Sequence, residues 1–374
     1  MIKKNLFLAF SVCALCSCNR HLNLLIGSYS DGTTSGISVY DFNTWNGNLE
    51  YVSDIDDVIN PSYLVVAPDG QIVYAVNETL DGKVSAFQFN KRTAKLSPLN
   101  SQSAKSSDPC FININKKGTF IVTANYSSGS ISLFPLAKDG HIQPLTQSIS
   151  MNTTIGGDAS QASRIHTVQF SQDGKWIYAT DLGKDKIYKF EITSQEGETS
   201  LVQDRKATTR LEAGSGPRHL AFHPRGRYIY CMNELSGTVT AFAQDSGRLV
   251  AFQTIASDVS SEEGQKGSAD IHLSPNGKFL YASNRAEAND IAIFSVTPKD
   301  GILTSVGSQK TGLHPRNFLI SPNGKFLLCA NRDSDTVQVF AINKKTGLLE
   351  DTGTVIQVGK PVCLKWVRNS NHRY

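Results

Sequence analysis

The chain has 374 residues, of which 40% are hydrophobic and 19% are charged. This composition is typical of a soluble globular protein that is large enough to bury a substantial core. The formal net charge of +4 is small and comes without a long run of Lys or Arg, so the sequence gives no electrostatic reason to expect nucleic acid as a partner.

Residues 1–18 differ in character from the rest of the chain. Lys3 and Lys4 precede a short apolar run over residues 6–15, and small residues follow as far as Cys18. This order is typical of a secretory signal. The tetrad LCSC at 15–18 also resembles a bacterial lipobox, in which the cysteine equivalent to Cys18 carries the lipid.

We therefore expect residues 1–18 to be a lipoprotein-type signal peptide. The mature chain would then lie in the cell envelope or periplasm and touch the membrane only through a lipid on Cys18. If the leader is not processed, residues 1–18 would instead form a buried N-terminal strand of a cytoplasmic protein. No later apolar run is long enough to span a bilayer.

Residues 22–367 contain a repeat that predicts the fold. Six segments share an apolar strand, a turn that ends in Gly, a second apolar strand and a terminal Asn or Asp, as in PSYLVVAPDGQIVYAVNE from Pro61. A third apolar strand follows each, such as KVSAFQF after the first. A period of about 50 residues with four short strands is typical of a β-propeller blade. The turn glycines are Gly70, Gly118, Gly174, Gly226, Gly277 and Gly324.

The seventh blade is expected to be divided between the two ends of the chain. Residues near the start supply LNLLIGSYS, GISVYDF and LEYVSDI, which resemble strands two, three and four of a blade. Residues 361–367, PVCLKWV, resemble a first strand without successors. Joining the two parts closes the ring and removes two exposed sheet edges. The sequence therefore predicts an all-β, seven-bladed β-propeller with four-stranded antiparallel blades, forming a single domain over residues 22–367.

Charged residues break the symmetry of the repeat at one rim of the predicted ring. The start of each first strand and the end of each second strand meet at the same end of a blade, because the two strands are antiparallel. At these equivalent positions, uncharged residues in some blades are replaced by charged or titratable ones in others. Glu78 is one of the latter, and the others that would line the rim are His166, Arg218, Glu234, Arg285, Arg316 and Arg332, with His219 and His314 close by in sequence.

Four arginines around one opening repel one another unless an anion or carboxylate neutralises them. Arg is well suited to bidentate binding of phosphate or carboxylate, so we expect a small anionic ligand at this rim. An alternative is that each arginine pairs with a nearby acidic residue such as Asp333 or simply faces solvent. His166 and Glu234 are the candidates for proton transfer. We expect neither a metal nor an organic cofactor, because the sequence has no matching motif.

The blocks GSGPRHLAFHPRGRYIYCMNELSGTVTAF, TDLGKDKIYKF and LYASNRAEANDIAIF resemble the seven-bladed propeller lactonases, a family that includes propeller-type 6-phosphogluconolactonases and fungal carboxymuconate lactonizing enzymes. The resemblance extends from about Leu24 to Val367. It implies that His166, Arg218, Glu234 and Arg285 are catalytic. The block before His166 departs from the family pattern, since it contains SRIH where the family often has two histidines.

The sequence thus favours a monomeric lactone hydrolase, a carboxylic ester hydrolase acting on a small anionic sugar lactone, with 6-phosphogluconolactone first among the candidates. Arg218 or Arg285 would stabilise the oxyanion. The expected substrate-binding residues are Arg316, Arg332, His219 and His314. Two alternatives remain open: a muconate-type lactonizing or cycloisomerase activity at the same rim, and a propeller at the cell envelope that binds a ligand without turnover.

Overall fold

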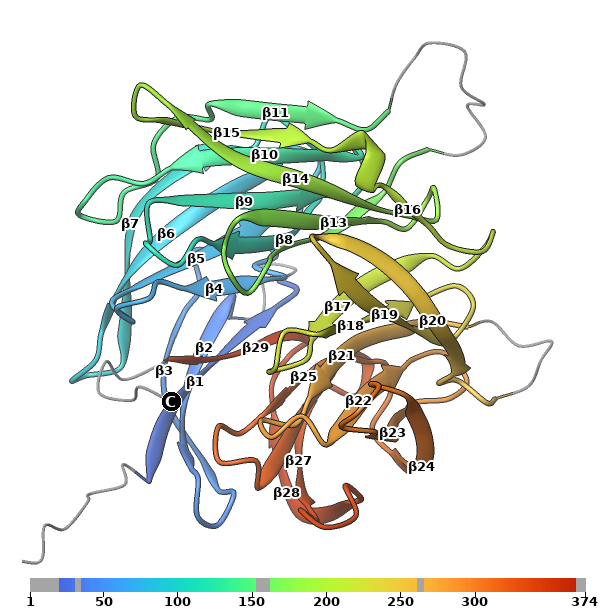
Figure 1. Ribbon diagram of the computed structural model, residues 1–374. Helices are drawn as coiled ribbons and strands as arrows, with labels where there is room; N and C mark the ends of the chain where they lie inside the picture. Colours follow the sequence, from blue (N-terminus) through green and yellow to red (C-terminus); the bar gives the residue numbers. More distant parts are fainter. Residues whose placement is uncertain (1–19, 31–34, 153–161, 261–265, 368–374) are drawn as a thin grey trace, which may run out of the picture.

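The computed structural model describes residues 20–30, 35–152, 162–260 and 266–367. Their strands form seven antiparallel sheets arranged as blades around a central channel (Figure 1). In each blade the first strand lies at the channel and the last lies at the outside. The predicted all-β, seven-bladed propeller with four-stranded blades is therefore confirmed. Cys18 and the proposed leader lie outside the described residues.

The first three blades in chain order have the following strands, from the channel outwards. They are β4 (Leu64–Val66), β5 (Ile72–Asn77), β6 (Lys83–Asn90) and β7 (Lys95–Ser103); β8 (Pro109–Ile114), β9 (Phe120–Asn125), β10 (Ser130–Pro135) and β11 (Gln147–Ser150); and β12 (Ile165–Phe170), β13 (Trp176–Asp181), β14 (Lys186–Gln195) and β15 (Glu198–Gln203). The short strand β16 (Thr209–Arg210) also pairs with β14, after the 3-10 turn η1 (Arg205–Ala207).

The next three blades follow the same order. They are β17 (Pro217–Phe222), β18 (Tyr228–Asn233), β19 (Thr238–Asp245) and β20 (Arg248–Ala256); β21 (Ser268–Leu273), β22 (Phe279–Asn284), β23 (Asp290–Val296) and β24 (Leu303–Lys310); and β25 (Pro315–Ile320), β26 (Phe326–Asn331), β27 (Thr336–Ile342) and β28 (Leu349–Gln357). A 3-10 turn, η2 (Arg332–Ser334), connects β26 to β27.

The seventh blade consists of β29 (Pro361–Val367), β1 (His21–Ser28), β2 (Ile37–Asn43) and β3 (Leu49–Ile55), so the two ends of the chain share it as predicted. Figure 1 shows the red β29 beside the blue β1. Gly27 of β1 lies so close to the next blade that a Cβ there would be 2.3 Å from the carbonyl oxygen of Pro61. A residue without a side chain is therefore required where the ring closes.

The turns between first and second strands explain why the repeat is visible in the sequence. The turn glycines all have φ between 64° and 72°, a range that glycine adopts without steric cost. Neighbouring blades are joined by another repeated contact, in which a second-strand tyrosine donates a hydrogen bond of 2.8–3.0 Å to a glycine carbonyl of the next blade. The pairs are Tyr74–Gly140, Tyr178–Gly247, Tyr230–Gly301 and Tyr281–Gly347.

A β-bulge at the start of most first strands places the rim residues. In β12 the bulge falls between Ile165 and Thr167, so His166 is the additional residue, and in β25 it makes Arg316 the additional residue. In β17 both Arg218 and His219 fall within the bulge. A bulge bends the strand and redirects a side chain. Consecutive residues such as Arg218 and His219 can therefore both lie at the channel. Within the described residues, no helix has the length and hydropathy needed to cross a bilayer.

Candidate active site

Glu234, the residue directly after β18, lies between two arginines from different blades. Its Oε1 is 3.0 Å from Nη2 of Arg285, and its Oε2 is 2.9 Å from Nε of Arg218. The contact with Arg218 is an ion pair without the angle of a regular hydrogen bond. The Arg218 side chain is only 2% exposed and that of Arg285 only 9%. One carboxylate is therefore shared by two buried guanidinium groups, which leaves a net positive charge.

Backbone carbonyls hold both arginines in place, that of Ala269 in the next blade for Arg218 and that of Gly267, just before β21 of its own blade, for Arg285. Nη1 of Arg218 donates a 2.7 Å hydrogen bond to the carbonyl of Ala269, and Nε of Arg285 donates one of 2.6 Å to the carbonyl of Gly267. Such bonds leave the guanidinium charge in place, because a carbonyl is neutral. The two arginines are thus fixed in orientation, as electrostatic stabilisation of a transition state requires.

Arg316, at the start of β25, is held more loosely by a second acidic residue. Its Nη2 lies 3.9 Å from Oε2 of Glu78, and its guanidinium lies over the ring of Tyr29, 5.3 Å from the centroid. The Tyr29 hydroxyl donates to both oxygens of Glu78, at 3.0 and 3.1 Å. The charge of Arg316 is also among those that lower the pKa values of Glu234 and His166.

The rings of His166 and His219 pack together next to Arg218, whose Nη1 is 3.2 Å from Nε2 of His219. Their ring centroids are 5.2 Å apart, and the ring of Tyr126 lies 5.6 Å from that of His166 on another side. Within the described part of the chain, Nδ1 of His166 is buried without a hydrogen-bond partner. A buried imidazole nitrogen of this kind is available to exchange a proton with a substrate or water.

The arginines determine which of these groups carry a charge. Burial would raise the pKa of Glu234, but the charges of Arg285 and Arg218 lower it below its ordinary value, so the carboxylate is ionised. Burial and the charge of Arg218 lower the pKa of His166 well below its ordinary value. The same two causes lower the pKa of His219 to about 4. Both histidines are therefore neutral near pH 7.

His314 and Arg332 lie further out on the same rim and are tied to Asp333. Arg332 forms two hydrogen bonds with the Asp333 carboxylate, of 2.6 and 3.0 Å, and Nδ1 of His314 lies 3.3 Å from it. His314 Nε2 is 3.4 Å from Nη1 of Arg285, which connects the two groups of residues. The pairing of Arg332 with Asp333 is the alternative that the sequence left open for each rim arginine.

Comparison with known proteins now identifies the family. The family model described as lactonase, 7-bladed beta-propeller, matches residues 23–366. The chain belongs to the seven-bladed β-propeller lactonase family. A 6-phosphogluconolactonase from Formosa agariphila is 37% identical over 335 residues, covering 87% of this chain and 94% of the relative.

Solved structures of the lactonase family agree with this assignment. A putative 6-phosphogluconolactonase from Bacteroides fragilis is 43% identical, with a TM-score of 0.88 and coverage of 94% of this chain and 99% of that one. A periplasmic gluconolactonase from Pseudomonas aeruginosa is 32% identical, also with a TM-score of 0.88, and coverage of 93% and 99%. The predicted family is confirmed, and so is lactone hydrolysis as the activity of its named members.

The structure brings most of the predicted site residues together at this rim. Glu234 contacts Arg218 and Arg285, and His166 is connected to Arg218 through the ring of His219, while Arg316 contacts Glu78 and Tyr29. His219 lies one layer deeper in the channel, where its Nδ1 is 2.7 Å from Asp270. Which of these residues are catalytic stays a prediction. Among the described residues, no three His, Cys, Asp or Glu side chains form a group suited to a metal ion.

Tyr29 is the residue at this rim that the sequence analysis missed. It directly follows β1, the second strand of the closing blade, just as Glu78 follows β5 in the next blade. The sequence did contain a signal for Tyr29. The other second strands end in Asn or Asp, and β1 ends in Ser28 at the equivalent position. Aligning Ser28 with those markers would have placed Tyr29 on the rim beside Glu78.

Proposed function

We propose that this chain hydrolyses a 1,5-lactone that carries an anionic group, with 6-phosphogluconolactone as the first candidate. The observation that supports this most is that Arg218 and Arg285 share the single carboxylate of Glu234, with Arg316 beside them. This arrangement leaves positive charge in a largely dry site, where it acts strongly on a developing oxyanion. The relatives named 6-phosphogluconolactonase support the choice of substrate.

In the proposed reaction, water attacks the lactone carbonyl carbon. The carbonyl oxygen becomes an oxyanion against the guanidinium of Arg218 or Arg285, and the carbon–oxygen bond of the ring then breaks. The proton lost by the water passes to a base and from there to the ring oxygen, which leaves as a hydroxyl group. The product is the open-chain acid, and no cofactor takes part in this balance.

His166 is the better candidate for the base of the two groups named from the sequence. Both carboxylate oxygens of Glu234 are already paired with arginines, one with Arg218 and one with Arg285. His166 is neutral and its Nδ1 accepts no hydrogen bond from the described residues. We therefore assign Glu234 the role of positioning Arg218 and Arg285, and His166 the role of accepting the proton from water.

The anionic group of the substrate would bind between Arg316 and the outer part of the rim. Only one contact of 3.9 Å with Glu78 links Arg316 to an acidic side chain among the described residues, so most of its N–H groups remain available. A cavity of about 390 Å³ lies close by, lined in part by Tyr29, Arg332 and Lys360. A distal phosphate placed there would lie near cationic side chains from two blades.

An unphosphorylated gluconolactone is the second candidate substrate. The P. aeruginosa relative carries that name and is periplasmic. The proposed leader would also bring this chain to the cell envelope, and Arg332 already has a carboxylate partner in Asp333. A comparison of kcat/KM for the two lactones at equal concentration separates the candidates, since only the phosphorylated lactone gains from Arg316.

The experiment that tests the proposal measures lactone opening by the purified protein and its Arg218→Ala variant. Loss of an oxyanion donor should lower kcat by about 100- to 1,000-fold. Arg225→Ala, in an exposed turn, is the matched control and should keep the wild-type rate. Equal background rates for wild type and Arg218→Ala on both lactones would overturn the proposal. Turnover of a muconate-type diacid, or ligand binding without turnover, would then support the alternative functions.

We also propose that Cys18 is lipidated after removal of the leader, so that residues 22–367 act as a single propeller domain at the cell envelope. The supports are the lipobox-like tetrad at 15–18 and the periplasmic relative. Metabolic labelling with a fatty-acid probe should mark the wild type and not Cys18→Ala. Equal labelling of both would refute lipidation at this residue. Light scattering of the soluble domain tests the expected monomer.

A further inference from the structure

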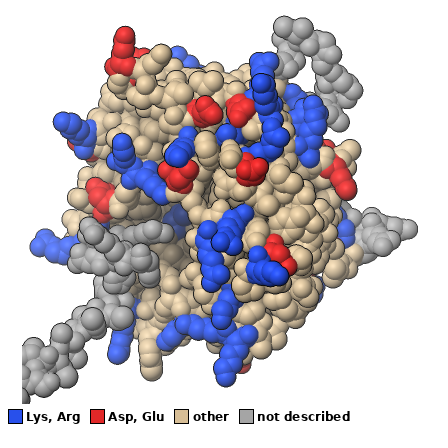
Figure 2. Space-filling model, viewed as in Figure 1, with Lys and Arg blue, Asp and Glu red and all other residues tan. Residues whose placement is uncertain are grey.

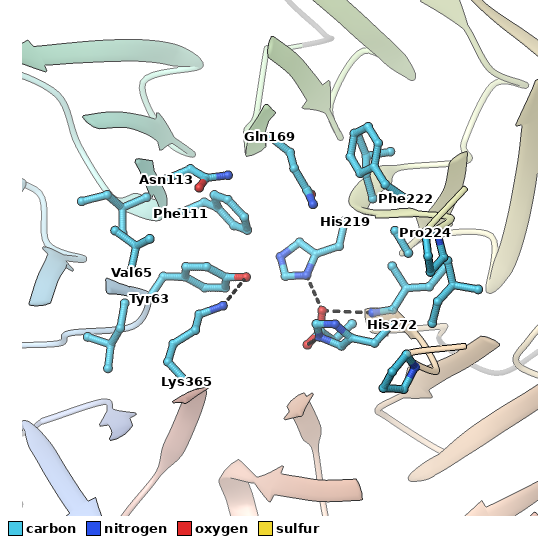
Figure 3. A pocket seen from close by; sticks show the side chains of 18 of the residues that line it. Tyr63, Val65, Phe111, Asn113, Gln169, His219, Phe222, Pro224, His272 and Lys365 are labelled. Carbon is cyan, nitrogen blue, oxygen red and sulfur yellow. Dashed lines mark hydrogen bonds and ion pairs between the residues drawn. The ribbon is translucent and has the colours of Figure 1, made fainter. Parts of the chain in front are cut away.

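A second cavity, of about 390 Å³, lies in the half of the channel away from the arginine rim (Figure 3). We call it the lower-channel cavity. It is lined by first-strand residues from several blades and, at its mouth, by Pro224 and Pro275 of the turns that lead to the second strands. These turns are at the opposite end of the strands from Arg218, and His219 lies between the two sites. The mechanism above does not use this cavity.

Asp270 is the acidic residue that lines the lower-channel cavity, and hydrogen-bond donors fully occupy its carboxylate. Oδ1 of Asp270 accepts from Nδ1 of His219 and from the backbone N–H of Ile271, at 2.7 and 3.0 Å. Its Oδ2 accepts from His272 and from the side chain of Asn317, among other donors. With five N–H donors around one carboxylate, Asp270 has no lone pair left for a ligand.

On the opposite wall of the cavity, several hydrogen-bond donors have no acceptor among the described residues. Nζ of Lys365 makes one hydrogen bond, of 3.1 Å to the hydroxyl of Tyr63, and lies over that ring at 4.2 Å. The remaining ammonium hydrogens of Lys365 and the hydroxyl proton of Tyr63 have no acceptor among the described residues. Gln169 likewise makes no side-chain hydrogen bond there, and Figure 3 shows its amide directed into the cavity.

Among the described residues, no ionised side chain accepts a hydrogen bond from these donors. Burial raises the pKa of Tyr63, so its phenol is neutral at physiological pH. Lys365 is half-buried, so its charge is partly desolvated, and an anion in contact with Nζ would offset that cost. The positive end of the cavity is therefore complementary to an acceptor with a negative charge.

Apolar and aromatic side chains form most of the remaining wall, which also includes Asn113 and Ser274. Phe111 stacks on Tyr63 with ring centroids 4.1 Å apart, and Phe222 lines the cavity from the adjacent side with the prolines of the mouth. Few convergent polar groups in an otherwise apolar cavity are typical of a small-molecule site. Figure 3 shows Lys365 and Tyr63 meeting on one side and His272 on the other, and the ring of His219 lies edge-on to that of Tyr63, with centroids 6.0 Å apart.

We propose that the lower-channel cavity binds a small organic carboxylate, with its carboxylate on Lys365 and Tyr63 and its apolar body against Phe111 and Phe222. This site is separate from the rim at which lactone hydrolysis is proposed, and its occupancy does not depend on that activity. Pro224 and Pro275 are exposed, so the ligand enters from the face of the propeller opposite the rim.

The test is a fluorine NMR titration of the full chain with 4-fluorobenzoate. Wild type should bind saturably, and Lys365→Met should weaken binding by about tenfold or more, because a hydrogen bond to a charged group is lost. Tyr63→Phe, which keeps the ring, should weaken it by about fivefold. Arg316→Met, which removes a cation from the rim, should leave the affinity for 4-fluorobenzoate unchanged.

The neutral analogue 4-fluorobenzyl alcohol serves as the probe control and should bind wild type and Lys365→Met alike. Three results would overturn the proposal. They are no saturable binding by wild type, equal affinity of 4-fluorobenzoate for wild type and Tyr63→Phe, and loss of binding in Arg316→Met. If Lys365→Met does not fold, Tyr63→Phe and Gln169→Leu decide the outcome, since both keep the charge and should still weaken binding.

Discussion

Replacing Glu234 by Gln should destabilise the protein while it lowers the catalytic rate. The substitution keeps the size and shape of the side chain but removes the charge shared by Arg218 and Arg285, at 2.9 and 3.0 Å. For scale, two opposite unit charges 4 Å apart attract each other by about 4 kcal/mol at an effective dielectric constant of about 20. Removing one partner of a buried pair costs about 3–5 kcal/mol, since the other charge stays buried. The Glu234 side chain is 20% exposed, so we expect the lower end, about 3 kcal/mol.

Urea unfolding followed by circular dichroism measures this loss, with Glu191→Gln as the matched control. Glu191 also faces a cation, Lys189 at 3.9 Å, but its side chain is 53% exposed, so its loss should cost less than about 1 kcal/mol. The pKa of Glu234 is lowered in the folded state. Its contribution is therefore present above the unfolded pKa and is lost as the pH falls through the folded pKa. The difference between wild type and Glu234→Gln should narrow below about pH 4.

The kinetic result should separate binding from catalysis. Without the carboxylate the rim is more positive, so KM for an anionic lactone should stay equal or fall, while kcat falls because Arg218 and Arg285 lose their common anchor. A Glu234→Gln variant that unfolds within about 0.5 kcal/mol of wild type would refute the argument from shared charge. An unchanged kcat would refute the positioning role.

Three further predictions follow from contacts described above. If His166 is the base, its lowered pKa keeps it neutral in mild acid, so the acidic limb of the pH profile of kcat/KM should lie below about pH 6.5; a limb at or above that value would exclude it. Tyr29→Phe removes both hydroxyl contacts to Glu78 and should raise KM about fivefold with little change in kcat, as steady-state kinetics would show. Gly27→Ala should lower stability by about 1–3 kcal/mol in urea unfolding, because its Cβ would meet the Pro61 carbonyl, and wild-type stability would contradict the close approach.

The fold could be predicted from the sequence because each blade repeats the same local requirements. The turn glycine and the terminal Asn or Asp mark both ends of the second strand, as with Gly70 and Asn77. Even the divided blade was recognisable, since residues 361–367 lacked a partner strand. A pattern that recurs six times determines register and strand order, which a single strand pattern does not.

The site was less predictable, because its chemistry depends on contacts between blades. The sequence indicated that Arg218, Glu234 and Arg285 gather on one rim, but not that one carboxylate serves both arginines. It also could not show that Arg332 is held by Asp333. The lower-channel cavity has no signature in the repeat at all, because Lys365 and Tyr63 come from opposite ends of the sequence and meet only when the ring is closed.

Charge on the surface gives little guidance to either site. On the face shown in Figure 2, basic side chains are more prominent than acidic ones, with uncharged surface between many of them. The guanidinium groups of Arg218 and Arg285, by contrast, are buried in the channel. The electrostatic field that a ligand meets is therefore set by a few dehydrated charges, which act more strongly than the exposed ones.

The pairing of β1 with β29 has a consequence for biosynthesis. The inner edge of β1 stays without its neighbour until residues 361–367 have left the ribosome, roughly 20–70 s later at about 5–20 residues per second. During that time a row of unpaired backbone N–H and C=O groups can recruit a strand from another chain. Premature termination before Pro361 would make the exposure permanent, so truncated chains should aggregate or be degraded rather than persist as six-bladed rings.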